Sequence, residues 1–187
     1  MKRIMDSIVE RIMDKEKWPS LEMPENLELL NELADREFDL GTFPGMLAAL
    51  LMYHQIVEAL CVHLLEDCHF MIQLALYPAT IHFKVDQSKM LGSYIKDLRE
   101  TVDFKDKDKF IGKVEEFNRI RNTIVHKMRR SNGGELSPLL RKGRASFEGI
   151  LDLYVEIQDD FCLIFHSYKK DIFRDYAEND LLPEPDE

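Results

Sequence analysis

Apolar residues recur every three or four positions along most of this chain, which is the spacing of amphipathic α-helices. The helices that this spacing predicts cover residues 1–17, 25–36, 45–76, 87–102 and 106–130, and a long last segment. That last helix is expected to begin with Ser137 as its cap and Pro138 at its first position. Residues 77–86 are predicted to be a connector, and no strand–turn–helix alternation occurs. We therefore expect an all-α fold, a single-domain bundle of five or six helices.

Residues 45–76 are apolar around most of the predicted helix, so this helix is expected to lie at the centre, packed on several sides. Its polar residues fall in a band about 120° wide. They include His54, Glu58, Glu66 and His69. The longest unbroken apolar run, 46–53, is too short to span a bilayer.

The 187 residues are enough for one domain with a full core. We expect residues 1–43 to form amphipathic helices and a linker that pack on the bundle, and residues 44–178 to form the bundle itself. Residues 179–187 are acidic and contain proline, and they are predicted to be a disordered tail. The first residues run into an amphipathic pattern rather than the apolar core of a signal peptide. Three cysteines without C-x-x-C spacing suit a reduced compartment, so a cytoplasmic location is expected.

The formal net charge of −10 argues against a general nucleic-acid or membrane-surface binder. The stretch 127–144 is nevertheless basic, because it carries six cations and a single acid, Glu135. Such a patch is compatible with binding a phosphate, although charged helix ends are also commonly just solvated. The six cations are Lys127, Arg129, Arg130, Arg141, Lys142 and Arg144.

An arginine lies in the apolar face of the helix predicted over 106–130. At about 100° per residue, one stripe of that helix is apolar; it contains Phe117, Ile120, Ile124, Val125 and Met128. Arg121 projects only about 40° from Phe117, so it points into this stripe. A guanidinium aimed at an apolar face is costly unless it is paired. Glu58 on the central helix is the candidate partner.

The pattern Arg121-Asn122-x-x-x-His126, in an all-α context, resembles the R-x4-6-H signature of the HEPN superfamily (higher eukaryotes and prokaryotes nucleotide-binding). Residues 91–98 look like the helix that often precedes the motif, and 116–122 look like its usual lead-in. The resemblance covers about residues 44–175. A subset of the family has Tyr two positions after the His, where this chain has Met128.

This resemblance implies a helical bundle that forms a homodimer, with both motifs facing one composite cleft. Many members are metal-independent endoribonucleases that act as toxins or phage-defence effectors, some with a protein antitoxin. Arg121 would then neutralise the scissile phosphate, His126 would move the proton, and Asn122 would orient the phosphate or the His. No cofactor is implied. The expected RNA contacts are Lys127, Arg129, Arg130 and Arg141.

The side-chain chemistry suits these roles. Histidine titrates near neutrality, and arginine offers a planar fork for phosphate. On one helix Arg121 and His126 diverge by about 140°, so a two-fold dimer would be needed to bring them together. The alternative is a non-catalytic HEPN-like interaction or regulatory protein, in which Arg121 pairs with Glu58 and His126 is a surface residue.

A metal site is the competing chemical hypothesis, because several potential ligands crowd residues 61–69. Glu66-x-x-His69 has the spacing of half a di-iron site, but no second E-x-x-H occurs. The potential ligands also point in different directions around the helix, so no metal is predicted. They are Cys61, His63, Glu66, Asp67, Cys68 and His69.

Overall fold

The computed structural model describes residues 24–76, 79, 81–86, 88–130 and 133–178, with the helical backbone alone at 166 and 168–178. Within these residues the fold is all-helical and contains no strand, which confirms the predicted all-α bundle. The helix predicted over 1–17 and the predicted tail 179–187 lie outside the described residues. The helices are α2 (Glu25–Asp39), α3 (Phe43–Leu76), α4 (Leu91–Glu100), α5 (Lys107–Lys127) and α6 (Gly133–Glu178).

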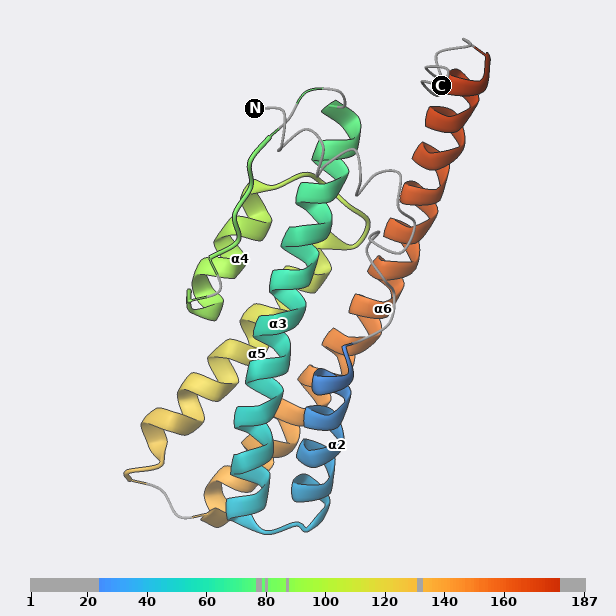
Figure 1. Cartoon of the computed structure of the whole chain (residues 1–187). Coiled ribbons are helices and arrows are strands. Elements are labelled where there is room, and N and C mark those ends of the chain that lie inside the picture. Colours follow the sequence, from blue (N-terminus) through green and yellow to red (C-terminus); the bar gives the residue numbers. More distant parts are fainter. Residues whose placement is uncertain (1–23, 77–78, 80, 87, 131–132, 179–187) are drawn as a thin grey trace.

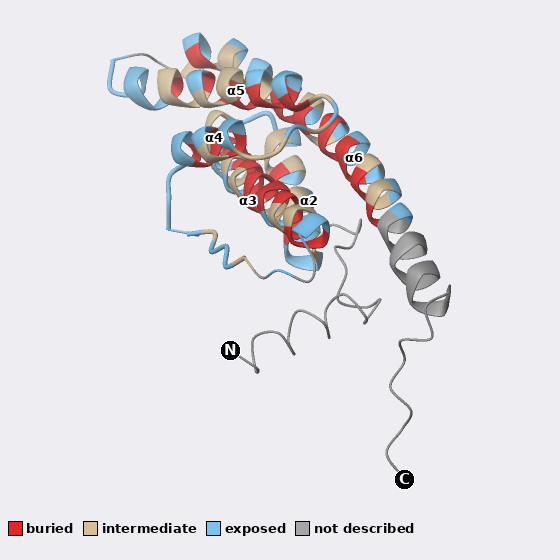
Figure 2. Cartoon of the chain, turned by 90° about the horizontal axis from the view of Figure 1, so that it is seen from above, coloured by how far each residue is buried: buried red, intermediate tan, exposed pale blue. Residues whose placement is uncertain are grey.

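Helix α3 is the centre of the bundle and packs against each of the other four helices (Figure 1). Seen from above, α4, α3 and α2 form one row and α5 and α6 a second, with buried residues on the facing sides (Figure 2). Successive residues of α3, such as Leu64 and Leu65, are both buried, as expected for a helix packed on several sides. The length and composition of α3 would also suit a membrane span, but 56% of its most apolar window is buried inside the bundle.

Aromatic rings join α3, α5 and α6 in the middle of the core. Tyr53 stacks on Phe147 with ring centroids 4.2 Å apart, and the ring of Phe117 is tilted against Phe147 with centroids 6.5 Å apart. The hydroxyl of Tyr53 donates a hydrogen bond of 2.6 Å to Asp35 on α2. Burial and this bond raise the pKa of Tyr53. Four helices thus meet at one aromatic cluster.

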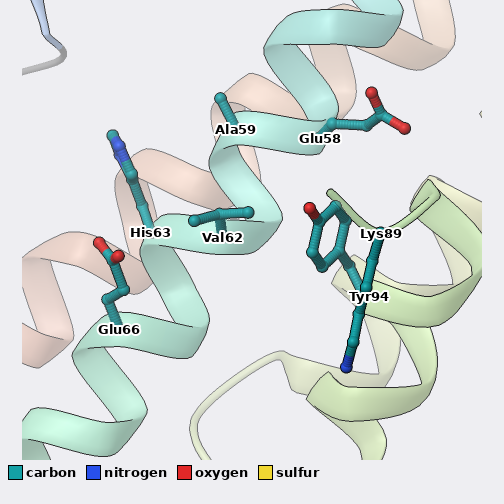
Figure 3. Close-up of a pocket in the computed structure, with 7 residues that line it drawn as sticks. All are labelled: Glu58, Ala59, Val62, His63, Glu66, Lys89 and Tyr94. Atoms are coloured by element: carbon teal, nitrogen blue, oxygen red, sulfur yellow. The ribbon is translucent and has the colours of Figure 1, made fainter. Parts of the chain in front are cut away.

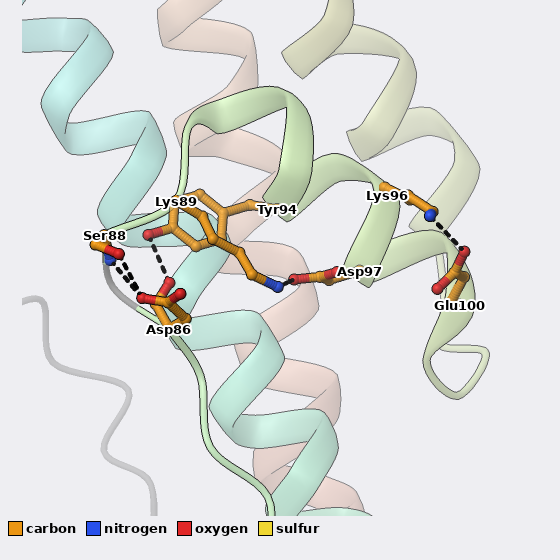
Figure 4. Close-up of polar contacts among 7 residues, drawn as sticks. All are labelled: Asp86, Ser88, Lys89, Tyr94, Lys96, Asp97 and Glu100. Carbon is orange, nitrogen blue, oxygen red and sulfur yellow. Dashed lines mark hydrogen bonds and ion pairs between the residues drawn. The ribbon is translucent and has the colours of Figure 1, made fainter.

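Helix α4 begins at Leu91, four residues later than predicted, because Asp86 and Ser88 form local polar contacts ahead of it (Figure 4). The carboxylate of Asp86 accepts hydrogen bonds from the backbone N–H of Ser88 at 3.0 Å and from its hydroxyl at 2.7 Å. Tyr94 donates its hydroxyl to the Asp86 carbonyl at 3.1 Å. These local bonds compete with helix formation, since a side-chain acceptor can satisfy a backbone N–H group outside a helix.

Helix α6 begins at Gly133, so the prediction that Ser137 caps it and Pro138 opens it is wrong. Pro138 is the sixth helical residue and removes only one backbone hydrogen bond near the helix start. The Ser137 hydroxyl donates to the Gly133 carbonyl at 2.8 Å. Leu136, two residues before Pro138, is 1% exposed. The burial of Leu136 in a helical turn therefore outweighs the preference of proline for the first helical position.

A buried lysine joins α4 to α5. The ammonium group of Lys107 donates to the carbonyls of Arg99, Thr101 and Val102 at 3.2, 2.9 and 3.3 Å, and it lies 3.2 Å from the Asp103 carboxylate. A cation is favourable at a helix C-terminus, where carbonyl groups lack intrahelical partners. Lys107 therefore caps α4 from the first residue of α5.

Helices α2 and α3 approach closely at Gly45. A Cβ atom there would lie 2.5 Å from the backbone oxygen of Glu37. Gly45→Ala must move backbone, and we expect it to lower the free energy of unfolding by about 1–3 kcal/mol in urea titrations. Gly112→Ala is the matched control, because a Cβ atom at that position would meet no side chain and no backbone of another segment within 4 Å. It should raise that free energy by up to about 1 kcal/mol, since alanine is the better helix former. Equal effects of the two substitutions would contradict the close approach.

Candidate functional site

Arg121 lies half-buried on α5 and is only partly satisfied by hydrogen bonds. Its Nη1 donates to Oδ1 of Asn122 at 3.0 Å, and Nδ2 of Asn122 donates to Oδ1 of Asn118 at 3.5 Å. The Nε atom of Arg121 is buried and has no hydrogen-bond partner among the described residues. A buried donor without an acceptor is costly. The guanidinium of Arg121 is therefore only partly satisfied by the described residues.

Glu58, the expected partner of Arg121, has other partners in the structure. Its Oε1 accepts the backbone N–H of Leu91 at 3.1 Å, and its Oε2 lies 3.7 Å from Nδ1 of His54. Within the described part of the chain, no ion pair joins Glu58 to Arg121. The physical reason is that α4 begins without a side-chain cap of its own, so its free N–H groups attract this carboxylate.

His54 connects Glu58 to the surroundings of Arg121. The imidazole lies one turn before Glu58 on α3 and stacks on Phe117 of α5, with ring centroids 6.4 Å apart and planes at 25°. Burial lowers the pKa of His54, the nearby Glu58 carboxylate raises it, and the Arg121 charge lowers it. His54 is thus within electrostatic reach of both groups. The sequence placed His54 and Glu58 in one polar band and suggested Glu58 as the partner of Arg121, but it did not single out His54.

On its other side, Glu58 lines a pocket of about 290 Å³ between α3 and the start of α4 (Figure 3). Tyr94 and Lys89 contribute the α4 side, and His63 and Glu66 continue the α3 side. The ammonium of Lys89 is bound to Asp97 at 2.6 Å, and burial lowers the pKa of His63. The two carboxylates that line the pocket, Glu58 and Glu66, therefore form no ion pair with Lys89, which is the lysine of the lining.

His126 is exposed on the last turn of α5, about 180° around the helix from Phe117. Val125 and Met128 flank it and are 40% and 43% exposed, so these two members of the predicted apolar stripe are not buried. Val125 lies at the edge of the stripe, about 80° from Phe117. Met128 follows the last helical residue, Lys127. Among the stripe residues from 124 to 128, Ile124 is the one that is buried in the core.

Two of the six cations in the stretch 127–144 form ion pairs within the bundle. Lys142 lies 2.9 Å from Glu116, and Arg144 lies 2.6 Å from Asp39 and 3.0 Å from Glu148. The other four are exposed, and no described residue forms an ion pair with them. They are the expected RNA contacts Lys127, Arg129, Arg130 and Arg141.

The potential metal ligands of residues 61–69 are dispersed. No three of the His, Cys, Asp and Glu side chains described come together as a metal-binding group. Cys61 and Cys68 are buried, and burial raises the pKa of the Cys68 thiol to about 12. His63 hydrogen-bonds Tyr154 of α6 at 3.4 Å, whereas the ring of His69 stacks on Phe83 at 4.1 Å.

The site therefore consists of Arg121, Asn122 and Asn118 on α5, while His54 of α3 stacks on Phe117 one turn before Arg121 and lies 3.7 Å from Glu58. His126 lies on the same helix but on another side. The fold is an all-α bundle, and in the described part of the chain Arg121 on α5 has a buried Nε without a hydrogen-bond partner. The chain matches no protein-family model, no curated protein and no solved structure.

Proposed function

We propose that this protein is a metal-independent endoribonuclease of the HEPN type, acting as a homodimer with a composite active site. The observation that carries the proposal is the state of Arg121, a half-buried guanidinium held by Asn122 whose Nε has no partner among the described residues. A planar, permanently charged fork with free donors is the group that binds a phosphodiester best. Asn122 occupies one donor and so orients the others.

In this mechanism Arg121 binds the scissile phosphate and neutralises charge as it develops. His126 removes the proton from the ribose 2′-hydroxyl, or returns one to the leaving 5′-oxygen, since an imidazole can do either near neutral pH. The attack by the 2′-oxygen forms a 2′,3′-cyclic phosphate and releases a 5′-hydroxyl. The RNA backbone is held by the four exposed cations, Lys127, Arg129, Arg130 and Arg141.

The geometry of α5 supports the proposed homodimer. Arg121 and His126 of one chain diverge by about 140°, so one chain does not present both to a single phosphate. Val125 and Met128 are apolar, exposed and adjacent to His126. Two-fold packing of these side chains would remove them from water and bring the partner's His126 towards Arg121. We propose that such a protein acts in the cytoplasm as a toxin or phage-defence effector, with or without a protein antitoxin.

A non-catalytic interaction or regulatory protein is the second candidate. It is favoured by the position of His126, which is exposed and remote from Arg121 within one chain, and by the net charge of −10, which repels RNA outside the basic patch. In that case the same α5 face would bind a protein partner without turnover of RNA.

The test is RNA cleavage in excess EDTA by wild type and His126→Ala, purified side by side. Wild type should cut and leave 2′,3′-cyclic phosphate ends, while His126→Ala should be slower by about 10²–10⁴-fold, the usual contribution of acid–base catalysis. RNA with 2′-O-methyl groups should resist cleavage, because the nucleophile is blocked. If neither protein cuts varied RNAs, the protein is not a ribonuclease. Equal cleavage by both would show that His126 takes no part.

A further inference from the structure

We propose that a pocket between α5 and α6 binds one nucleotide of a single-stranded RNA, with the guanidinium of Arg119 at its phosphate. The pocket has a volume of about 340 Å³, which lies within the range of small-molecule sites, about 300–1,000 Å³. The inference rests on the proposed function in taking RNA as the ligand, but it requires no cleavage. The lining consists of Glu116, Arg119, Ile120 and Thr123 from α5 and of Leu139 and Lys142 from α6.

The charged groups of this pocket leave one positive charge available to an anion. Lys142 lies 2.9 Å from Glu116, and its hydrogen bond lowers the pKa of that carboxyl group, so the two form an ion pair without net charge. Arg119 is exposed, and within the described part of the chain no ion pair joins it to an acid. A planar guanidinium can bind a phosphodiester through two parallel hydrogen bonds. Arg119 is therefore the phosphate-binding group of the pocket.

The rest of the lining suits a base and a ribose. Ile120 is 6% exposed and Leu139 is partly buried against the core, so the apolar side chains are the more buried part of the lining. The hydroxyl of Thr123 donates to the carbonyl of Arg119 at 2.8 Å, and its oxygen can still accept a hydrogen bond. Single-stranded RNA offers unstacked bases, which pack against flat or apolar groups and use their edges for hydrogen bonds. An acidic peptide offers the charge but no such base.

The pocket opens on the side of α5 that carries His126. Arg119 and His126 are both exposed and seven residues apart, so they project within about 20° of each other and lie roughly 10 Å apart along the helix axis. Arg121, in contrast, projects about 160° away from Arg119. In the proposed dimer, an RNA strand that reaches His126 therefore continues into the pocket of the same chain, while the scissile phosphate is bound by the Arg121 of the other chain.

The experiment is calorimetric titration of the full chain with 2′-O-methyl hexauridylate, which is not cleaved, at several salt concentrations. Arg119→Ala should weaken binding by about tenfold, because a charge-assisted hydrogen bond to phosphate is lost. It should also reduce the slope of log K against log salt concentration by about 0.7, the value for one phosphate contact on a single strand. Arg119 is exposed, so the substitution leaves the core intact.

Lys109→Ala is the matched control, because Lys109 is a cation of the same helix whose side chain is 59% exposed, about 15 Å along the axis from Arg119. It removes the same charge and should leave affinity and salt slope as in wild type. Equal weakening by both substitutions would show that total charge alone matters and would overturn the inference. So would the absence of binding in wild type. Hexaglutamate that binds as tightly, and with the same dependence on Arg119, would assign the pocket to an acidic protein partner instead.

A direct measurement locates the bound base. The same oligonucleotide carrying 4-thiouridine should form photo-crosslinks to Thr123, Leu139 or Lys142, identified by mass spectrometry, and crosslinks confined to other segments contradict the inference. The two proposals fail separately. Binding that depends on Arg119 without cleavage of unmodified RNA would support the pocket and remove the ribonuclease. Cleavage with a KM that Arg119→Ala leaves unchanged would support the ribonuclease and remove the pocket.

Discussion

An equimolar mixture of the Arg121→Ala and His126→Ala proteins is expected to regain about a quarter of wild-type RNA cleavage, although each variant alone has lost it. In a composite site, Arg121 of one chain acts together with the partner's His126. A mixed dimer then contains one site with both groups intact. Random exchange makes about half of the dimers mixed, and each has one working site of two. Cleavage rates after subunit exchange, followed by native mass spectrometry, give the result.

The control is the double variant Arg121→Ala/His126→Ala mixed with either single variant. No pairing of these chains contains a complete site, so the mixture must remain inactive. If the mixture of single variants remained inactive although subunit exchange was demonstrated, that result would contradict a site formed by one Arg121 and one His126 from different chains. Both groups would then have to come from one chain, or all four would be required.

Phe147→Ala is expected to lower the free energy of unfolding by about 3–5 kcal/mol, among the largest effects available in this chain. Phe147 is 1% exposed and lies between Tyr53 and Phe117, so truncation leaves a cavity where α3, α5 and α6 meet. The rigid helices around it cannot close that cavity fully. Urea unfolding followed by circular dichroism gives the change, provided that the slope with denaturant is unaltered.

Leu29→Ala supplies the comparison for Phe147→Ala. Leu29 is 58% exposed on α2, and alanine is at least as good a helix former, so the change should stay within about 0.5 kcal/mol. If Phe147→Ala cost no more than Leu29→Ala, the aromatic cluster would not be the centre of the core.

The periodicity of apolar residues was sufficient to predict the fold class and the central place of α3, because an amphipathic or wholly apolar helix has few ways to bury its surface. The ends of the helices were less predictable. The start of α4 depends on the turn at Asp86, and the start of α6 depends on the burial of Leu136. Both are decided by contacts that local helix signals do not contain.

The unusual position of Arg121 was visible in the sequence, since a cation in an apolar stripe breaks the helical pattern by itself. The residues that lie near it in the fold could not be predicted in the same way. Glu58 was expected to pair with it, but that carboxylate accepts the N–H of Leu91 at the start of α4 and lies 3.7 Å from His54. The sequence alone therefore determined which helix carries the arginine and which faces are apolar. The tertiary structure alone decided which residues of α3 lie near this part of α5, because residues 63 positions apart, such as His54 and Phe117, come together only when the two helices pack.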